Sequence, residues 1–89
     1  MEKKKYNVII NPAARRDLDK LRFEDYKRIY TAMKNLEDIP RPPGCIKLAG
    51  GVNEFRIIIG KFRVLYDVSD KSESVTIYRI LPRDKAYKR

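Results

Sequence analysis

The sequence predicts one α+β domain, residues 1–89, in which an antiparallel, twisted sheet carries a two-helix hairpin packed on one face. Residues 55–66 (FRIIIGKFRVLY) place β-forming residues on both sides of Gly60 and Lys61, which is typical of a β-hairpin with a two-residue turn. Residues 12–38 instead repeat apolar side chains every three or four positions, which is typical of amphipathic helices. The expected order of elements is β-α-α-β-β-β.

The first half of the chain is predicted to form one strand and two helices. Residues 5–10 (KYNVII) form the strand, and Asn11 and Pro12 supply the N-cap and the first residue of a helix. A second helix is expected over about 23–38, and Pro40 ends it. The apolar stripes are Ala13, Ala14, Leu18 and Leu21 in the first helix, and Tyr26, Ile29, Tyr30, Met33 and Leu36 in the second.

The central hairpin follows a short strand at 46–48, and its two-residue turn fixes the register. The expected pairs are Ile59 with Phe62, Ile58 with Arg63, Ile57 with Val64, and Arg56 with Leu65. Because side chains alternate between faces, Phe55, Ile57, Ile59, Phe62, Val64 and Tyr66 share the core face. Arg56 and Arg63 share the other face, which we expect to be open and suited to phosphate.

The last strand is predicted over about 74–81, after a turn at 69–73. Pairing of Val68 with Ser74 would place Arg79 opposite Arg63, and would direct Thr76, Tyr78 and Ile80 into the core. A slip of one residue would reverse these faces, and the five-residue turn does not fix the register.

Charge gives the first indication of function. The chain has 21 Lys and Arg against 12 Asp and Glu, a net charge of +9. In so short a chain this charge indicates a polyanionic partner, such as nucleic acid, a ribosome or an acidic protein, although a surface that serves solubility alone is the alternative. No apolar run reaches 18 residues, so we expect no membrane span and a cytoplasmic protein.

Several types of catalysis are excluded by composition. Cys45 is the single cysteine and the chain has no histidine, so a Cys–His pair and an internal disulfide are both ruled out. One cysteine without histidine is also insufficient for a structural zinc site. We therefore expect no metal and no cofactor.

Four segments in order carry a family resemblance: YNVIINPAARRDLDKL, IPRPPGCIKLAG, EFRIIIGKFRVLYDV and ILPRDKAYK. Together they cover nearly the whole chain, and they resemble the RelE/ParE superfamily of toxins from type II toxin–antitoxin systems. Within it the chain is most similar to RelE-like mRNA endonucleases of the archaeal type. The resemblance implies a RelE-like fold and ribosome-dependent cleavage of mRNA in the A site, which inhibits translation.

The resemblance also assigns functional residues. Arg63, Arg83 and Tyr87 match the family's arginines and C-terminal tyrosine, and Arg56 stands where some bacterial members have a lysine. A second lysine of those members is replaced by Ile58, which puts a lysine-based mechanism in doubt. The basic residues expected to bind RNA or the ribosome are Lys47, Lys61, Arg79, Lys85 and Lys88.

The chemistry of RNA cleavage distributes roles among these residues. Arginine stays protonated, so Arg56, Arg63 and Arg83 are interpreted as electrostatic clamps on the scissile phosphate. Tyr87 is the candidate for proton transfer, with Lys85 as a substitute. Structural alternatives are that Tyr87 packs the tail down and that Arg56 pairs with Glu54 or Asp67.

The expected partners are a cognate RelB-like antitoxin, the ribosome and mRNA, with operator DNA bound only through the antitoxin. Two other functions remain open. A ParE-like protein would poison DNA gyrase without nuclease activity and would not need the arginines and the terminal tyrosine. A degenerate, non-toxic RNA-binding homologue would account for Ile58 in place of lysine.

Overall fold

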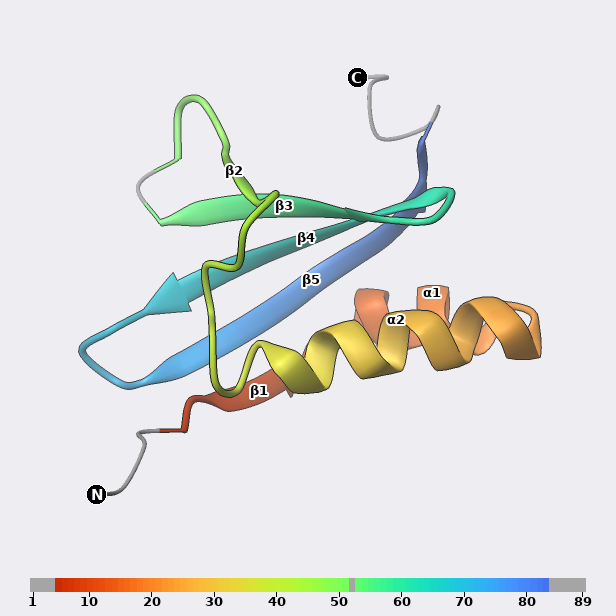
Figure 1. Cartoon of the computed structure of the whole chain (residues 1–89), viewed down its shortest axis with the longest axis horizontal. Coiled ribbons are helices and arrows are strands. Elements are labelled where there is room, and N and C mark those ends of the chain that lie inside the picture. The colour runs from red at the N-terminus through yellow and green to blue at the C-terminus, as the bar shows by residue number, and fades with distance from the viewer. Residues whose placement is uncertain (1–4, 52, 84–89) are drawn as a thin grey trace.

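The computed structural model describes residues 5–51 and 53–83. The two helices and the strands of one sheet follow one another along the chain as Figure 1 shows. The elements are β1 (Asn7–Ile10), α1 (Pro12–Asp19), α2 (Phe23–Asn35), β2 (Ile46–Lys47), β3 (Glu54–Ile59), β4 (Phe62–Ser69) and β5 (Ser74–Pro82). The expected α+β class and order of elements are confirmed, with one strand pairing that differs.

Helix α1 begins as its sequence predicts. The Asn11 side chain accepts a hydrogen bond from the Ala14 N–H at 3.0 Å, and Pro12 occupies the first turn. Helix α2 ends at Asn35, three residues before the expected limit, and a turn precedes Pro40. The buried residues of the two helices join the apolar face of the sheet in one core: Ala14, Leu18, Ile29, Met33 and Leu36.

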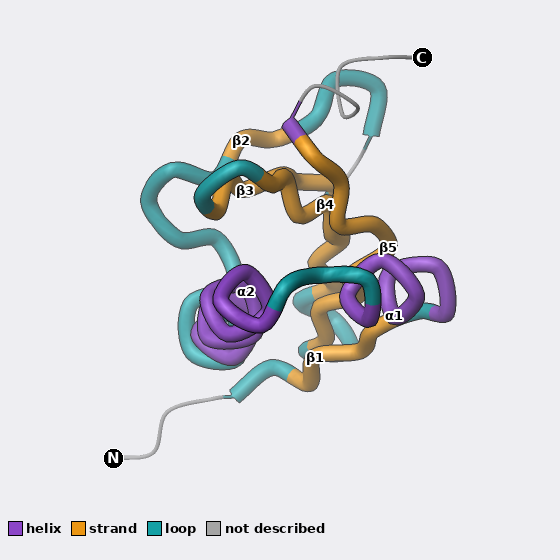
Figure 2. Tube along the Cα trace, turned by 90° about the vertical axis from the view of Figure 1, so that its right-hand side faces the viewer, coloured by secondary structure: helices purple, strands orange, loops and turns teal. Residues whose placement is uncertain are grey.

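The sheet has the strand order β1-β5-β4-β3-β2 and is mixed. The pairs β2–β3, β3–β4 and β4–β5 are antiparallel, as expected, but β1 pairs with β5 in parallel. The wholly antiparallel sheet predicted from the sequence is therefore wrong at this one pair. Figure 2 shows α1 beside β5, past the point where β1 ends, and the short connection between the helices.

The β3–β4 hairpin has the predicted register, from Phe55 opposite Tyr66 to Ile59 opposite Phe62. Gly60 has a φ of +61°, and Lys61 has no positive φ. This combination matches a type II′ turn, in which glycine stands at the first central position. The short turn therefore determines which side chains share a face.

The β4–β5 register differs from the prediction. Val68 lies opposite Val75, Leu65 lies opposite Arg79, and Arg63 lies opposite Leu81. The register shifts between Leu65 and Tyr66, so that Tyr78 is an extra residue on β5, as in a β-bulge. As a result Val75, Ile77 and Ile80 are buried in place of the predicted set, of which only Ile80 is correct.

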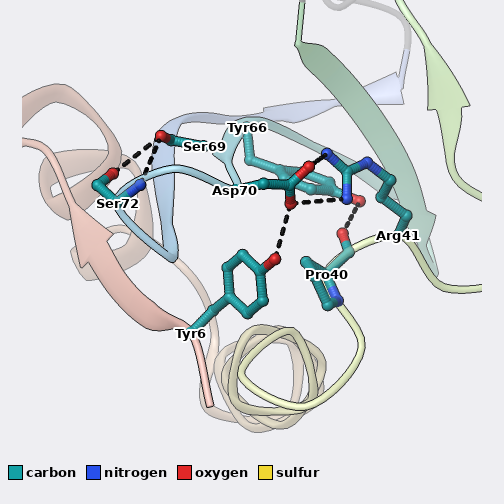
Figure 3. Close-up of polar contacts among 7 residues, drawn as sticks. All are labelled: Tyr6, Pro40, Arg41, Tyr66, Ser69, Asp70 and Ser72. Atoms are coloured by element: carbon teal, nitrogen blue, oxygen red, sulfur yellow. Dashed lines mark hydrogen bonds and ion pairs between the residues drawn. The ribbon is translucent and has the colours of Figure 1, made fainter. Parts of the chain in front are cut away.

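A network of hydrogen bonds joins the connection between α2 and β2 to the C-terminal end of β4 (Figure 3). Arg41 donates two hydrogen bonds to Asp70, at 3.1 and 3.0 Å, and the Tyr6 hydroxyl donates a third at 2.7 Å. The hydroxyl of the buried Tyr66 donates to the Pro40 carbonyl at 3.0 Å. Asp70 follows β4, whereas the Gly60-Lys61 turn precedes it, so this network lies at the opposite end of the strand from that turn.

Candidate nucleic-acid interface

Three predicted residues meet at the β3–β4 turn: Lys61, Arg63 and Arg83, which we call the turn-end cluster. The Arg83 N–H donates to the Lys61 carbonyl at 2.8 Å, which holds the end of β5 against the turn. The Arg63 Nε in turn donates a long hydrogen bond of 3.5 Å to the Arg83 carbonyl. Residues 20 positions apart in the chain are thereby brought together by main-chain and side-chain contacts.

Arg63 is buried, with only 1% of its surface exposed. The expectation that its guanidinium lies on an open sheet surface is therefore wrong. Strand alternation correctly places Arg63 opposite Ile58, on the face away from Val64, but alternation does not say what covers that face. The hydrogen bond from Arg63 Nε is a structural contact, because it supports the backbone of Arg83.

Arg83 and Lys61 are exposed, unlike Arg63. Among residues 5–51 and 53–83, no ion pair involves either of these two side chains. Exposed cations that are not neutralised by neighbouring carboxylates attract polyanions. These two residues are therefore the solvent-accessible cations of the cluster.

Arg56 and Lys47 lie further along the sheet. Arg56 is half-buried and lies opposite Leu65 on one side and Ile46 on the other. On this face Arg56 and Arg63 are diagonal neighbours, a relation that separates Cα atoms by about 7–8 Å. Lys47 is exposed on the two-residue edge strand β2. The structure thus brings Arg56 near the cluster and leaves Lys47 at the edge of the sheet.

Arg79 is held by α1 instead of joining Arg63. Its Nε and Nη2 donate to the Asp17 carboxylate at 2.8 and 3.2 Å, and the Ile80 N–H donates to the same carboxylate at 2.9 Å. Both residues line a pocket of about 410 Å³ between the α1–α2 connection and the end of β5. The predicted position of Arg79 opposite Arg63 is wrong, because the register is already displaced by one residue at Val68 and Val75, and the bulge at Tyr78 adds a second.

Asp17 lies on α1 outside the apolar stripe that the sequence predicted for this helix. Partial burial by itself would raise its pKa, but hydrogen bonds from Arg79 and Ile80 and the charges of Arg79 and Lys20 outweigh it. The net result is a pKa below the ordinary 3.8. Asp17 therefore accepts a hydrogen bond from a backbone N–H of β5 at Ile80, beyond the part of β5 that pairs with β1.

Tyr87, Lys85 and Lys88 lie outside the described residues. Of the described tyrosines, Tyr78 lies on β5 and its hydroxyl donates to Glu54 Oε1 at 3.4 Å. Burial, with the charges of Glu54 and Asp67, raises the pKa of Tyr78 to about 12. Burial likewise raises the pKa of Tyr66. Both shifts move the pKa of the tyrosine further above neutral pH, so neither residue is suited to act as a general base.

The turn-end cluster contributes positive charges that hydrogen bonds to the backbone hold in place. Arginine guanidinium groups bind phosphate through paired N–H donors and stay protonated throughout a reaction. Such groups stabilise the negative charge that develops on a phosphorane, but they do not remove protons.

Comparison with known proteins assigns the family. Residues 8–87 match the model of the ParE toxin of the type II toxin–antitoxin system parDE. The chain therefore belongs to this family, within the RelE/ParE superfamily of type II toxins. No curated protein sequence gives a significant match.

Solved structures give the same result. The archaeal RelE–RelB complex from Pyrococcus horikoshii OT3 contains a similar chain, with 26% identity and a TM-score of 0.78 over 89% of this chain and 96% of that one. A chain of the RelBE2 toxin–antitoxin complex from Mycobacterium tuberculosis has 28% identity and a TM-score of 0.77 over 89% and 99%. The isolated E. coli RelE toxin, at 19% identity, has a TM-score of 0.77 over 86% and 83%, which shows the fold alone. The resemblance inferred from sequence is confirmed at the level of the superfamily.

Proposed function

We propose that this toxin is an endoribonuclease that cleaves mRNA in the ribosomal A site and so inhibits translation. The observation that carries the proposal is the turn-end cluster, in which the two arginines that match the nuclease pattern, Arg63 and Arg83, meet beside Lys61. A protein that acts only by binding gyrase has no need to place them together. Residues 1–89 would act as one toxin domain.

The exposure of each residue suggests its role. Arg83 and Lys61 contact the phosphate, while Arg63 positions the Arg83 backbone and adds charge from beneath. Arg56 extends the charged surface along β3. Tyr87, with Lys85 as the alternative, transfers the proton as the RNA 2′-hydroxyl attacks the adjacent phosphorus and the 5′ oxygen leaves.

The absence of histidine from the sequence supports dependence on the ribosome. A site that relies on charge and a high-pKa base is a weak catalyst for free RNA. Holding the mRNA in line for attack removes much of the barrier, because positioning alone contributes a large part of catalysis. The ribosome supplies that positioning in this proposal, and the protein acts in the cytoplasm.

The similar chains from P. horikoshii and M. tuberculosis come from toxin–antitoxin complexes. We propose a RelB-like antitoxin for this toxin as well. The net charge of +9 favours an acidic segment in that partner. DNA would be bound through the antitoxin.

The test is an in vitro translation reaction with purified protein, in which the 3′ ends of ribosome-bound mRNA are mapped. Arg83→Ala is the first variant, because Arg83 is exposed and its replacement should leave the fold intact. Arg15→Ala, an exposed arginine on α1, removes the same charge elsewhere. Cleavage at A-site codons that is lost with Arg83→Ala but kept with Arg15→Ala supports the proposal, and intact mRNA with the unaltered protein contradicts it.

Inhibition of DNA gyrase is the second candidate, and the match to a ParE family model favours it. The burial of Arg63 also favours it, because a buried guanidinium is less accessible to RNA, whereas Ile58 in place of lysine favours the degenerate, non-toxic RNA-binding homologue. A supercoiling assay separates the two functions: inhibition by a protein that leaves mRNA intact identifies a gyrase poison. Absence of both activities, with RNA binding retained, identifies a non-toxic homologue.

A further inference from the structure

Arg28 of α2 reaches across to the β3–β4 turn. A Cβ atom built on Gly60 would lie 2.8 Å from an Arg28 guanidinium nitrogen, so the side chain passes directly over the glycine. Gly60 and Lys61 are adjacent in the turn, and Lys61 is bonded to Arg83 through the main chain. Arg28 therefore adds a cation to the turn-end cluster from a helix that is distant in sequence.

The local sequence favours a different position for this side chain. Glu24 precedes Arg28 by four residues and Asp25 precedes it by three, the spacings at which helix-surface ion pairs form. Within the described residues, Arg28 forms an ion pair with neither. It instead lies exposed against Gly60, next in sequence to the cation Lys61, and repulsion between these like charges is reduced by solvent screening.

We propose that Arg28 and Lys61 form a phosphate-binding subsite for the RNA backbone on the α2 side of the turn. This inference rests on the proposed function only in taking RNA as the ligand. The charges come from α2, from the turn and from the end of β5, so they are spread out and suit a chain of phosphates better than one small anion. The backbone of mRNA and that of ribosomal RNA share this chemistry.

The test measures binding of a short single-stranded RNA oligonucleotide, and of purified ribosomes without mRNA, over a series of salt concentrations. Arg28→Ala should raise the Kd roughly three- to tenfold. It should also reduce the slope of log Kd against log salt by about 0.7 for the single strand. Arg15→Ala is the charge-matched control and should change neither value, and Arg28→Lys should restore most of the binding.

Gly60 offers an independent variant. Gly60→Ala places a methyl group against the Arg28 guanidinium and should weaken RNA binding in the same direction. Gly50→Ala is its control, because Gly50 also has a positive φ, +85°, but no atom lies within 4 Å of the added methyl. Both variants place alanine at a positive φ, so a difference in RNA binding between them reports the displacement of Arg28 when urea denaturation shows both to be folded.

The outcomes separate the two ligands and the two proposals. Loss of ribosome binding alone identifies ribosomal RNA as the ligand, and loss with the oligonucleotide as well identifies single-stranded RNA. An Arg28→Ala protein that binds both probes as tightly as Arg15→Ala overturns the inference, even if mRNA cleavage by the unaltered protein supports the proposed function. Conversely, reduced RNA binding by Arg28→Ala in a protein that cleaves no mRNA supports the inference while the proposed function fails.

Discussion

Arg63 lies on β4, Arg79 lies on β5 and Arg83 directly follows β5, yet each has different surroundings. Arg63 is buried and bonded to the Arg83 backbone, Arg79 is paired with Asp17, and Arg83 is exposed. A buried guanidinium is costly to desolvate and depends on the contacts around it, whereas an exposed one contributes little to stability. Substitution of these residues should therefore affect folding and RNA binding in different proportions.

Arg63→Ala should lower the free energy of unfolding by about 2–4 kcal/mol, because it removes a large buried side chain together with its hydrogen bonds. Arg83→Ala should change it by less than about 0.5 kcal/mol. Urea denaturation followed by circular dichroism measures both values. Equal stabilities for the two variants would show that Arg63 is not buried in solution.

Asp17→Asn tests the contact between α1 and β5. The lowered pKa of Asp17 means that its carboxylate stabilises the fold above pH 3.8, and that this stability is lost as the pH falls through the lower pKa of the folded state. We expect the variant to be less stable by about 1 kcal/mol at pH 7, because the neutral amide forms weaker hydrogen bonds with Arg79. The difference should shrink toward pH 2 in urea denaturation.

Asp19→Asn is the control for this comparison, since Asp19 is exposed on the same helix and has no ion pair among the described contacts. Its stability should follow that of the unaltered protein at both pH values. If Asp17→Asn and Asp19→Asn lower the free energy of unfolding by the same amount, the Asp17–Arg79 ion pair makes no specific contribution to stability.

At the scale of the elements, the register of two paired strands is predicted more accurately when the turn that joins them is short. The two-residue turn at Gly60-Lys61 allows one register, which the sequence predicted correctly. The five-residue turn before β5 allows several, and the bulge at Tyr78 reverses faces partway along the strand. The parallel pairing of β1 was missed because the order of elements does not state where a terminal strand joins the sheet.

The same reasoning explains which site residues were found. Arg63 and Arg83 were predicted from the hairpin register and the family resemblance. The burial of Arg63 was not predicted, because it depends on what covers its face of the sheet. Asp17 and Arg28 were missed because each lies on the polar side of a helix, where solvated charges are common. Gly60 is the residue of the sequence that indicates the position of Arg28, since glycine in a turn also allows another group to approach closely.

Tyr78 connects β5 to β3 across β4, and its titration should be visible in the stability of the sheet. With a pKa of about 12 in the fold and about 10 when unfolded, the neutral phenol stabilises the protein below pH 10, and this stability is lost as the pH rises toward 12. Tyr78→Phe should change stability little at pH 8. Between pH 8 and 11 it should lose about 1 kcal/mol less than the unaltered protein in urea denaturation, after allowance for solvent screening.

A steeper loss with Tyr78→Phe than with the unaltered protein would contradict this assignment. Tyr66→Phe serves as a comparison, because burial also raises the pKa of Tyr66, but its hydroxyl bonds to the Pro40 carbonyl. This variant should be less stable already at pH 8, by about 1 kcal/mol, through loss of that buried hydrogen bond.

At the scale of the whole molecule, the described residues at the two ends of β4 differ in how their positive charges are paired. At one end of β4 lie Lys61 and Arg83, with Arg28 against the adjacent Gly60, and no carboxylate is paired with any of the three cations in the described ranges. At the other end Arg41 is neutralised by Asp70. If the basic composition served solubility alone, this separation would have no consequence for binding.

Two exposed lysines provide a matched comparison of these ends. Lys61 lies in the turn before β4 and Lys71 in the turn after it, at a distance of about 25 Å if the eight residues of the strand are extended. Both substitutions to alanine remove one positive charge from an exposed turn and lower the net charge equally. We expect Lys61→Ala to weaken ribosome binding roughly three- to tenfold, and Lys71→Ala to leave it unchanged, in sedimentation assays at several salt concentrations. Equal losses would mean that the protein attracts RNA through its total charge, whereas a loss confined to Lys61 places the interface at the turn that joins β3 to β4.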